Sequence, residues 1–160
     1  MSSRRPRSPI RNPTRKEIPA DYKLELVLLP VSDVDRAKEF YVDRRGCDLI
    51  VDWAPNDGFR IVQANPPGSA CAVGFGVGLG VVAPPGSIRG LHAMVEDIVA
   101  ARDELVRRGV NVGAIRHMRD TEWHDGPHPE RLDYNSFAEF ADPDGNLWLL
   151  QERGYAGGNG

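Results

Sequence analysis

The chain has 160 residues, of which 41% are hydrophobic and 27% are charged, a composition typical of one globular domain. No run approaches the roughly 18–20 consecutive apolar residues that a membrane-spanning helix requires, which argues against a membrane protein. The formal net charge is −3, but residues 1–21 carry six basic and only two acidic side chains. The remaining chain is therefore acidic. This argues against nucleic acid as a partner, because phosphate binding requires a basic face on the folded domain.

Both ends of the chain have biased compositions. Residues 1–21 are rich in Arg, Pro and Ser and lack hydrophobic periodicity, which predicts a disordered basic tail. Residues 156–160 are mostly glycine and are expected to form a flexible end. Cys47 and Cys71 lie in apolar surroundings without CxxC spacing, which indicates buried free thiols. Free thiols suit a reducing compartment, so we expect a cytoplasmic protein.

The chain between these ends repeats itself. VSDVDRAKEFY begins at Val31, and VEDIVAARDEL begins at Val95. Each segment follows an apolar strand and places an Asp at a helix N-cap. Each helix then ends in two arginines followed by a glycine, Gly46 or Gly109. Acidic starts and basic ends suit the helix dipole, and glycine suits the left-handed residue after a helix, so the pattern predicts one helix in each half.

A second pair of segments repeats further along the chain. FRIVQANPPG begins at Phe59 and FAEFADPDG begins at Phe137, and each reads as a strand followed by a turn. The predicted strands, in chain order, lie near 24–31, 48–53, 59–64, 70–76, 88–95, 111–116, 135–141 and 146–152. We therefore predict an α+β fold of two tandem βαβββ modules, which must pair because one module is too small to close a core. The single domain spans 22–155, with module one at 22–77, a linker at 78–87 and module two at 88–155.

The motifs VSDVDRAKEFY, NSFAEFADPDGN and LWLLQE resemble those of the vicinal oxygen chelate superfamily. This superfamily contains glyoxalases, bleomycin-resistance proteins, fosfomycin-resistance enzymes and extradiol dioxygenases. The resemblance covers residues 23–153. It implies two curved mixed sheets whose concave faces enclose one pocket, with the helices on the convex faces.

The resemblance also implies where a metal would be held. Metal-dependent members bind one divalent ion through four inward side chains, usually His, Glu or Gln, and leave open positions for substrate oxygens. Counting from the motifs places these ligands at Leu26, Gly90, Leu149 and either Ala72 or Gly74. None of these residue types binds an ion. We therefore expect no cofactor and no metal in the usual site, while a divalent metal elsewhere stays an alternative.

Strand alternation predicts which other residues face the pocket. In module two, His92, Met94, Leu149, Gln151, Phe137 and Glu139 fall on the inward face. In module one, the repeat is interpreted as turning Arg60, Val62, Leu26 and Leu28 inward. A buried Arg60–Glu139 ion pair is one interpretation of this set. The other makes Glu139 or His92 a general base or a hydrogen-bonding anchor for a ligand.

A long insertion separates the predicted strands at 111–116 and 135–141. Loops of this length in compact domains are usually functional. Three interpretations stay open: a metal cluster of His117, His124 and His128, a lid that places Trp123 over the pocket, or a solvated or dimer-contacting loop. Trp53 is a further candidate for the pocket rim.

These observations lead to one set of candidate residues. The candidate catalytic residues are Glu139 and His92. The candidate ligand-binding residues are Arg60, Gln151, Phe137, Met94, Leu26, Leu149, Trp53, Trp123 and Tyr134. No residue is assigned to a metal.

The function that we predict is binding of a small, partly apolar organic molecule, as in bleomycin-resistance relatives. We expect the protein to be a homodimer that binds neither nucleic acid nor a membrane. One alternative is a divalent-metal-dependent lyase or dioxygenase of the same superfamily. Another is a non-catalytic regulatory or scaffolding dimer. If the protein is an enzyme, the resemblance implies a lyase, isomerase or dioxygenase type of activity.

Overall fold

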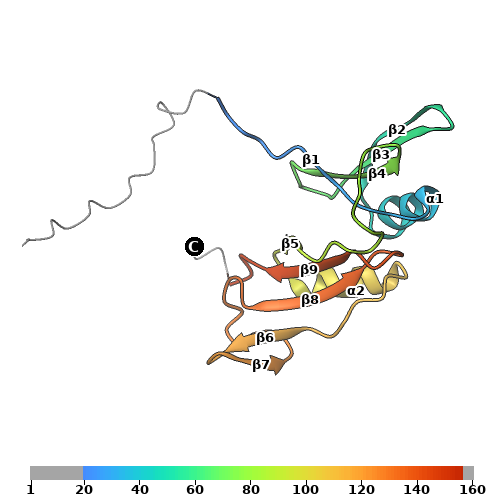
Figure 1. The fold of residues 1–160 in the computed structure, drawn as a ribbon. Coiled ribbons are helices and arrows are strands. Elements are labelled where there is room, and N and C mark those ends of the chain that lie inside the picture. The colour runs from blue at the N-terminus through green and yellow to red at the C-terminus, as the bar shows by residue number, and fades with distance from the viewer. Residues whose placement is uncertain (1–19, 157–160) are drawn as a thin grey trace, which may run out of the picture.

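The computed structural model describes residues 20–156 (Figure 1), so the predictions for residues 1–19 and 157–160 lie outside the described residues. Module one forms a four-stranded mixed sheet in the order β1-β4-β3-β2, in which β1 runs parallel to β4. We call it sheet one. Its strands are β1 (Leu26–Leu28), β2 (Asp48–Asn56), β3 (Phe59–Asn65) and β4 (Ala72–Val77). The helix α1 (Val34–Lys38) continues directly into the π-helix η2 (Glu39–Arg44).

Module two forms a five-stranded mixed sheet in the order β5-β9-β8-β6-β7, which we call sheet two. Its strands are β5 (Leu91–Val95), β6 (Arg116–Arg119), β7 (Glu122–Asp125), β8 (Ser136–Ala141) and β9 (Leu147–Glu152). The helix α2 (Ile98–Arg107) covers one face of this sheet (Figure 1). The predicted α+β fold of two tandem βαβββ modules is confirmed. No helix among residues 20–156 is long and apolar enough to cross a membrane.

The helices begin where the N-cap pattern predicts. The Asp33 carboxylate accepts a hydrogen bond from the Arg36 backbone N–H at 3.0 Å. Asp97 accepts from the N–H groups of Val99 and Ala100, each at 3.1 Å. These contacts satisfy backbone donors that have no partner within the first helical turn.

The predicted strand at 111–116 is wrong in its position. Val112 makes only an isolated bridge to Phe140, and the strand β6 starts at Arg116. The insertion is not an irregular loop, because β6 and β7 form an antiparallel hairpin that extends sheet two. Its two-residue turn holds Asp120 and Thr121 at φ of 52° and 63°. The Asn-Gly or Asp-Gly pair that usually signals such a turn is absent from this position, so the turn is difficult to predict from sequence.

Both modules share one hydrophobic core, and the helix of module one lies at its centre. The ring of Tyr41 stacks on Phe75 of sheet one at 5.5 Å and lies 6.0 Å from Trp148 of sheet two. Phe40 is 6.3 Å from Phe140 of sheet two. Because the helix-side faces of both sheets line this core, the opposite faces look outward in different directions. We call these outward faces the open faces of the sheets.

The DPDGN turn joins the modules by polar contacts. Asp142 Oδ1 accepts hydrogen bonds from the N–H groups of Asp144, Gly145 and Asn146, which fixes the turn. The Asn146 side chain then donates to the Pro30 carbonyl at 2.9 Å, and the Ser32 hydroxyl donates to Asp144 at 2.6 Å. The turn of module two is thereby attached to the segment just before α1 of module one.

Candidate functional site

The open face of sheet two gathers most of the candidate residues. Residues directly opposite each other on neighbouring strands point to the same face. One row across the sheet runs through Met94, Gln151, Phe137 and Arg116. A second row runs through His92, Leu149 and Glu139. The sequence prediction that these six candidates of module two share one face agrees with this register.

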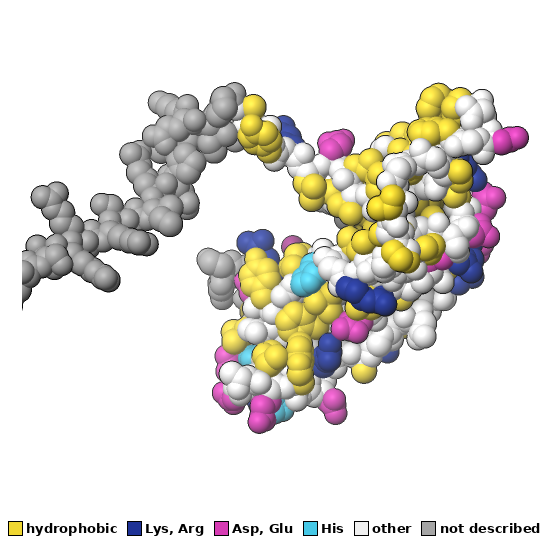
Figure 2. All heavy atoms as spheres, in the orientation of Figure 1, with side chains coloured by type: hydrophobic (Ala, Val, Ile, Leu, Met, Phe, Trp, Pro, Cys, Tyr) yellow, Lys and Arg dark blue, Asp and Glu magenta, His cyan; other side chains and the backbone are white. Residues whose placement is uncertain are grey.

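An aromatic cluster with an ion pair occupies the β6–β7 side of this face. Trp123 packs edge-on against Phe137 with ring centroids 5.3 Å apart. The Arg116 guanidinium lies 4.2 Å from the centroid of the Trp123 ring and donates to Glu139 Oε1 at 2.9 Å. Figure 2 shows hydrophobic side chains gathered over this sheet with charged side chains among them. Trp123 remains 48% exposed, so its ring is available to a ligand.

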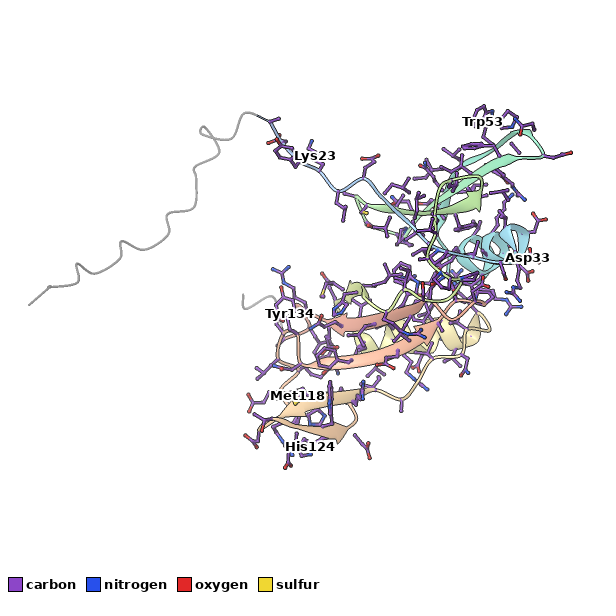
Figure 3. All side chains as sticks on the ribbon, in the orientation of Figure 1. Lys23, Asp33, Trp53, Met118, His124 and Tyr134 are labelled. Atoms are coloured by element: carbon purple, nitrogen blue, oxygen red, sulfur yellow. The ribbon has the colours of Figure 1, made fainter. Side chains whose placement is uncertain are left out.

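A polar chain occupies the opposite side of the same face. Gln151 Nε2 donates to the Tyr134 carbonyl at 3.0 Å, and Gln151 Oε1 lies 3.3 Å from His92 Nδ1. The amide oxygen can only accept, so a hydrogen bond here requires the proton on His92 Nδ1, and in that neutral tautomer Nε2 has a free lone pair. Tyr134 has φ of 65°, and Figure 3 shows it at the left-hand end of sheet two. His92 can thus accept a hydrogen bond from a ligand.

The open face of sheet one is more apolar. A Cβ added to Gly74 would lie 3.0 Å from Leu26 and 3.1 Å from Leu28, so both leucines cover this glycine. Trp53 pairs across the strands with Ile61 and packs edge-on against Phe59 at 5.7 Å. Trp53 is 57% exposed, and Figure 3 shows it on the upper strand of the sheet. Leu26 lies on the open face, as the alternation predicts, and Trp53, the candidate for the pocket rim, lies on the same face. Both belong to sheet one, whereas most of the other candidates lie on sheet two.

The predicted inward position of Arg60 is wrong. Arg60 shares a face with Val62, which is completely buried in the helix-side core. Its guanidinium donates to Asp35 of α1 at 2.7 Å and to both oxygens of Asp52 at 3.1 Å. The hydrogen bonds from Arg60 and then from Lys38 lower the pKa of Asp52 to about 2. Arg60 therefore attaches the helix of module one to its sheet and does not reach Glu139.

The predicted inward face of β3 is displaced by one residue. Matching Phe59 with Phe137 makes Ile61, not Arg60, the equivalent of Glu139, and a shift by one residue moves a side chain to the other face. The ion-pair partner that sequence reasoning missed is Arg116, on the displaced strand β6. The signal that could have found it is the apolar–polar alternation of the β6–β7 hairpin, which places Arg116 two residues before Met118 on one face.

The histidines of the hairpin lie on the opposite face from Trp123. The ring of His117 stacks on His124 at 5.3 Å and contacts His128 edge-on at 5.5 Å. His117 is buried, and its Nδ1 is 2.8 Å from the Gly126 carbonyl oxygen. Alternation along the two short strands separates these rings from Trp123, so the histidines and the tryptophan do not line one site.

The positions that hold a metal in related enzymes do not fit one here. Leu26, Gly90 and Leu149 have no donor atoms in their side chains, and Ala72 and Gly74 have none either. Within the part of the chain that the structure describes, no group of three or more His, Cys, Asp or Glu side chains is placed to hold a metal ion.

Comparison with known proteins places this geometry in a family. The family model "Glyoxalase/Bleomycin resistance protein/Dioxygenase superfamily" matches residues 23–150. TnmS3, an antibiotic binding protein from Streptomyces sp. CB03234, is 33% identical, with a TM-score of 0.64 over 83% of this chain and 97% of that chain. A superfamily member from Sphaerobacter thermophilus DSM 20745 is 26% identical, with a TM-score of 0.65 over 83% of this chain and 98% of that one. The uncharacterized protein YetH of Bacillus subtilis (strain 168) is 23% identical over 79% of this chain and 94% of its own length. The chain belongs to the glyoxalase/bleomycin resistance protein/dioxygenase superfamily.

Proposed function

We propose that this protein binds a small, partly apolar and aromatic organic molecule on the open face of sheet two, without a metal at the usual position. The observation that carries the proposal is the half-exposed Trp123, which is held in place by Phe137 and Arg116 beside the Glu139 carboxylate. The 33% identical TnmS3 is an antibiotic binding protein, which supports the same class of function for this chain.

The open face offers complementary groups to such a ligand. Trp123 and Phe137 provide aromatic surface for stacking, while Met94 and Leu149 provide an apolar floor. Polar anchors stand at both ends: the Glu139 carboxylate at one and the free His92 Nε2 at the other. An apolar site with few, well-placed polar groups is typical of small-molecule binding.

We also propose that the protein is a homodimer in which sheet one of one protomer covers sheet two of its partner. Within one chain the helix-side faces share the core, so the open faces do not oppose each other. An uncovered face carrying Trp53 and another carrying Trp123 would both be shielded in such a dimer. Light scattering at micromolar concentration tests the dimer, and a monomeric mass would reject it.

Ligand binding is tested by titrating the protein with a panel of antibiotics that carry planar aromatic groups, bleomycin among them. We expect at least one compound to raise Tm and to quench tryptophan emission, with both effects lost in Trp123→Ala. Tyr155→Ala is the matched control, because Tyr155 is an equally exposed aromatic residue that packs on Arg131 instead. A response retained in Trp123→Ala would show that the ligand does not bind here.

A mixing experiment tests whether the site is shared between protomers. Trp53→Ala and Trp123→Ala chains are each expected to bind weakly. In a shared site, co-refolding the two variants creates some sites that contain both tryptophans, so binding is partly restored. No restoration would mean that each site is made by one chain.

A catalytic role is the second candidate, and the geometry of His92 favours it. With Nδ1–H directed at Gln151, the Nε2 atom has the lone pair that a general base requires. An enzyme of this kind would convert a bound compound at a rate that falls in both His92→Ala and Glu139→Gln. A compound that raises Tm and is recovered unchanged after incubation supports binding alone, and no rise in Tm with any compound favours a scaffolding dimer.

A further inference from the structure

A cavity lies between the modules beside β5. His92 and Met94 of the open face of sheet two line part of it, whereas Trp123 and Glu139 do not. Its volume is about 660 Å³, within the range of small-molecule pockets. Module two contributes β5 and α2 to its wall, and module one contributes the turn at 66–71 and the end of η2. The apolar side chains that line it are mainly Val27, Val73, Leu91, Val95, Leu105 and Leu150.

The distinctive residue of this cavity is Arg45, which directly follows η2. Its guanidinium lies over the rings of Phe140 and Trp148, 5.5 and 5.8 Å from their centroids. Its Nε atom is buried and has no hydrogen-bond partner. Among residues 20–156, no carboxylate forms an ion pair with Arg45. Burial lowers the pKa of this arginine, as expected for a cation without an anionic partner in apolar surroundings.

A second guanidinium stands beside the first. Arg108 lies so close to the backbone of Gly46 that an added Cβ would be 3.0 Å from its Nη1 atom. The positive charge of Arg108 further lowers the pKa of Arg45. The Glu104 carboxylate, whose charge acts on Arg45 in the opposite sense, contacts Arg108 at 3.3 Å. Two cations and one anion therefore leave one positive charge unbalanced at the cavity wall.

We propose that this cavity binds a small organic anion with an apolar body, such as an aromatic carboxylate or sulfonate. The anionic group lies against Arg45, where it supplies the missing hydrogen-bond acceptor and cancels the excess charge. The apolar body fills the space between Leu91 and Leu105 of module two and Val27 of module one. The cavity meets the open face of sheet two at His92 and Met94, which belong to both, whereas Trp123 and Glu139 do not line the cavity. Arg45→Met and Trp123→Ala therefore test the two places separately.

The test uses two fluorescent probes that share one apolar body. 8-Anilino-1-naphthalenesulfonate carries a sulfonate, and N-phenyl-1-naphthylamine is its uncharged analogue. In Arg45→Met, which keeps a long apolar side chain over Phe140 and Trp148, we expect the Kd of the sulfonate to rise at least tenfold, about 1.4 kcal/mol at 25 °C. The Kd of the uncharged probe should change less than twofold. Arg107→Met, an exposed arginine of α2, removes the same charge outside the cavity and should leave both Kd values unchanged.

Three results would overturn the proposal. The first is sulfonate binding that is unaffected by Arg45→Met. The second is an equal loss for both probes, which would mean that the substitution damages an apolar surface and not an anion site. The third is sulfonate binding that is lost in Trp123→Ala instead, which would place the probe on the open face of sheet two.

A measurement on the wild-type protein avoids any effect of the substitution on folding. Cys71 lines the cavity and is half-buried, while Cys47 is fully buried elsewhere. We expect saturating 8-anilino-1-naphthalenesulfonate to slow iodoacetamide modification of Cys71 at least fivefold, and the uncharged analogue at equal concentration to protect less. An unchanged rate of modification in the presence of the bound sulfonate would overturn the proposal.

Discussion

Removing the Tyr41 hydroxyl tests whether polar contacts between the modules stabilise the fold. Tyr41 is completely buried, donates to Asp142 Oδ2 at 2.8 Å and accepts from Trp148 Nε1 at 3.1 Å. Burial, and then the neighbouring Asp142 carboxylate, raise the pKa of Tyr41 far above its usual range, so the hydroxyl keeps its proton and remains a donor. Tyr41→Phe keeps the ring that packs on Phe75 but removes both hydrogen bonds.

The expected loss follows from the two partners that remain. A hydrogen bond to a charged group contributes about 1.5–3 kcal/mol, and an orphaned buried N–H costs about 1–3 kcal/mol. In the variant, Asp142 Oδ2 still accepts a hydrogen bond from Asn146 at 2.7 Å. The lost bond to this carboxylate therefore counts at the lower end of its range, about 1.5 kcal/mol. We expect Tyr41→Phe to lower the free energy of unfolding by about 2.5–4.5 kcal/mol, the sum of the two losses.

Urea denaturation measures this loss as a shift of the midpoint at unchanged slope. Tyr22→Phe is the control, because Tyr22 is 86% exposed and its change should be within about 0.5 kcal/mol. A loss below about 0.5 kcal/mol in Tyr41→Phe would refute the reasoning, because the buried Trp148 N–H would then have found another acceptor.

Three further predictions concern single side chains. Glu139→Gln should change the free energy of unfolding by less than about 1 kcal/mol in urea, because its ion pair is half-exposed, yet weaken ligand binding in the Tm assay. Iodoacetamide at pH 8 should modify Cys71 and spare Cys47, whose pKa burial raises to about 11, until urea unfolds the protein; mass spectrometry reads the site. The pKa of Asp52 is lowered from 3.8 to about 2, so its stabilising contribution is present above pH 4 and is lost as the pH falls toward 2. In Asp52→Asn, the urea midpoint should depend less on pH over that interval than in the wild-type protein. An unchanged pH dependence would contradict the role given to Asp52.

The local chemistry of the sequence determined the repeat and its helices. The N-caps Asp33 and Asp97, and the glycines 46 and 109 after the helices, act within one turn of the chain, so they can be read without tertiary structure. The alternation of β8 and β9 likewise placed Glu139 and Leu149 on one face. These features are local, and the family resemblance followed from them.

Only the tertiary structure decided which face of sheet one Arg60 occupies and which residue pairs with Glu139. An alternating strand has two possible registers, and the burial of Val62 against the helix selects between them. Alternation within β6 can indicate the face on which Arg116 lies, but its place beside Glu139 follows only from the pairing of β6 with β8 across the sheet.

The cavity around Arg45 depends on tertiary structure in the same way. Its wall joins segments around residues 27, 45, 70, 92 and 105, which are far apart in the chain. They meet because the helix-side faces of both sheets close over one shared core, with Tyr41 between Phe75 and Trp148. A sequence pattern specifies which side chains each element buries, but the packing of two amphipathic layers against each other determines which buried groups become neighbours.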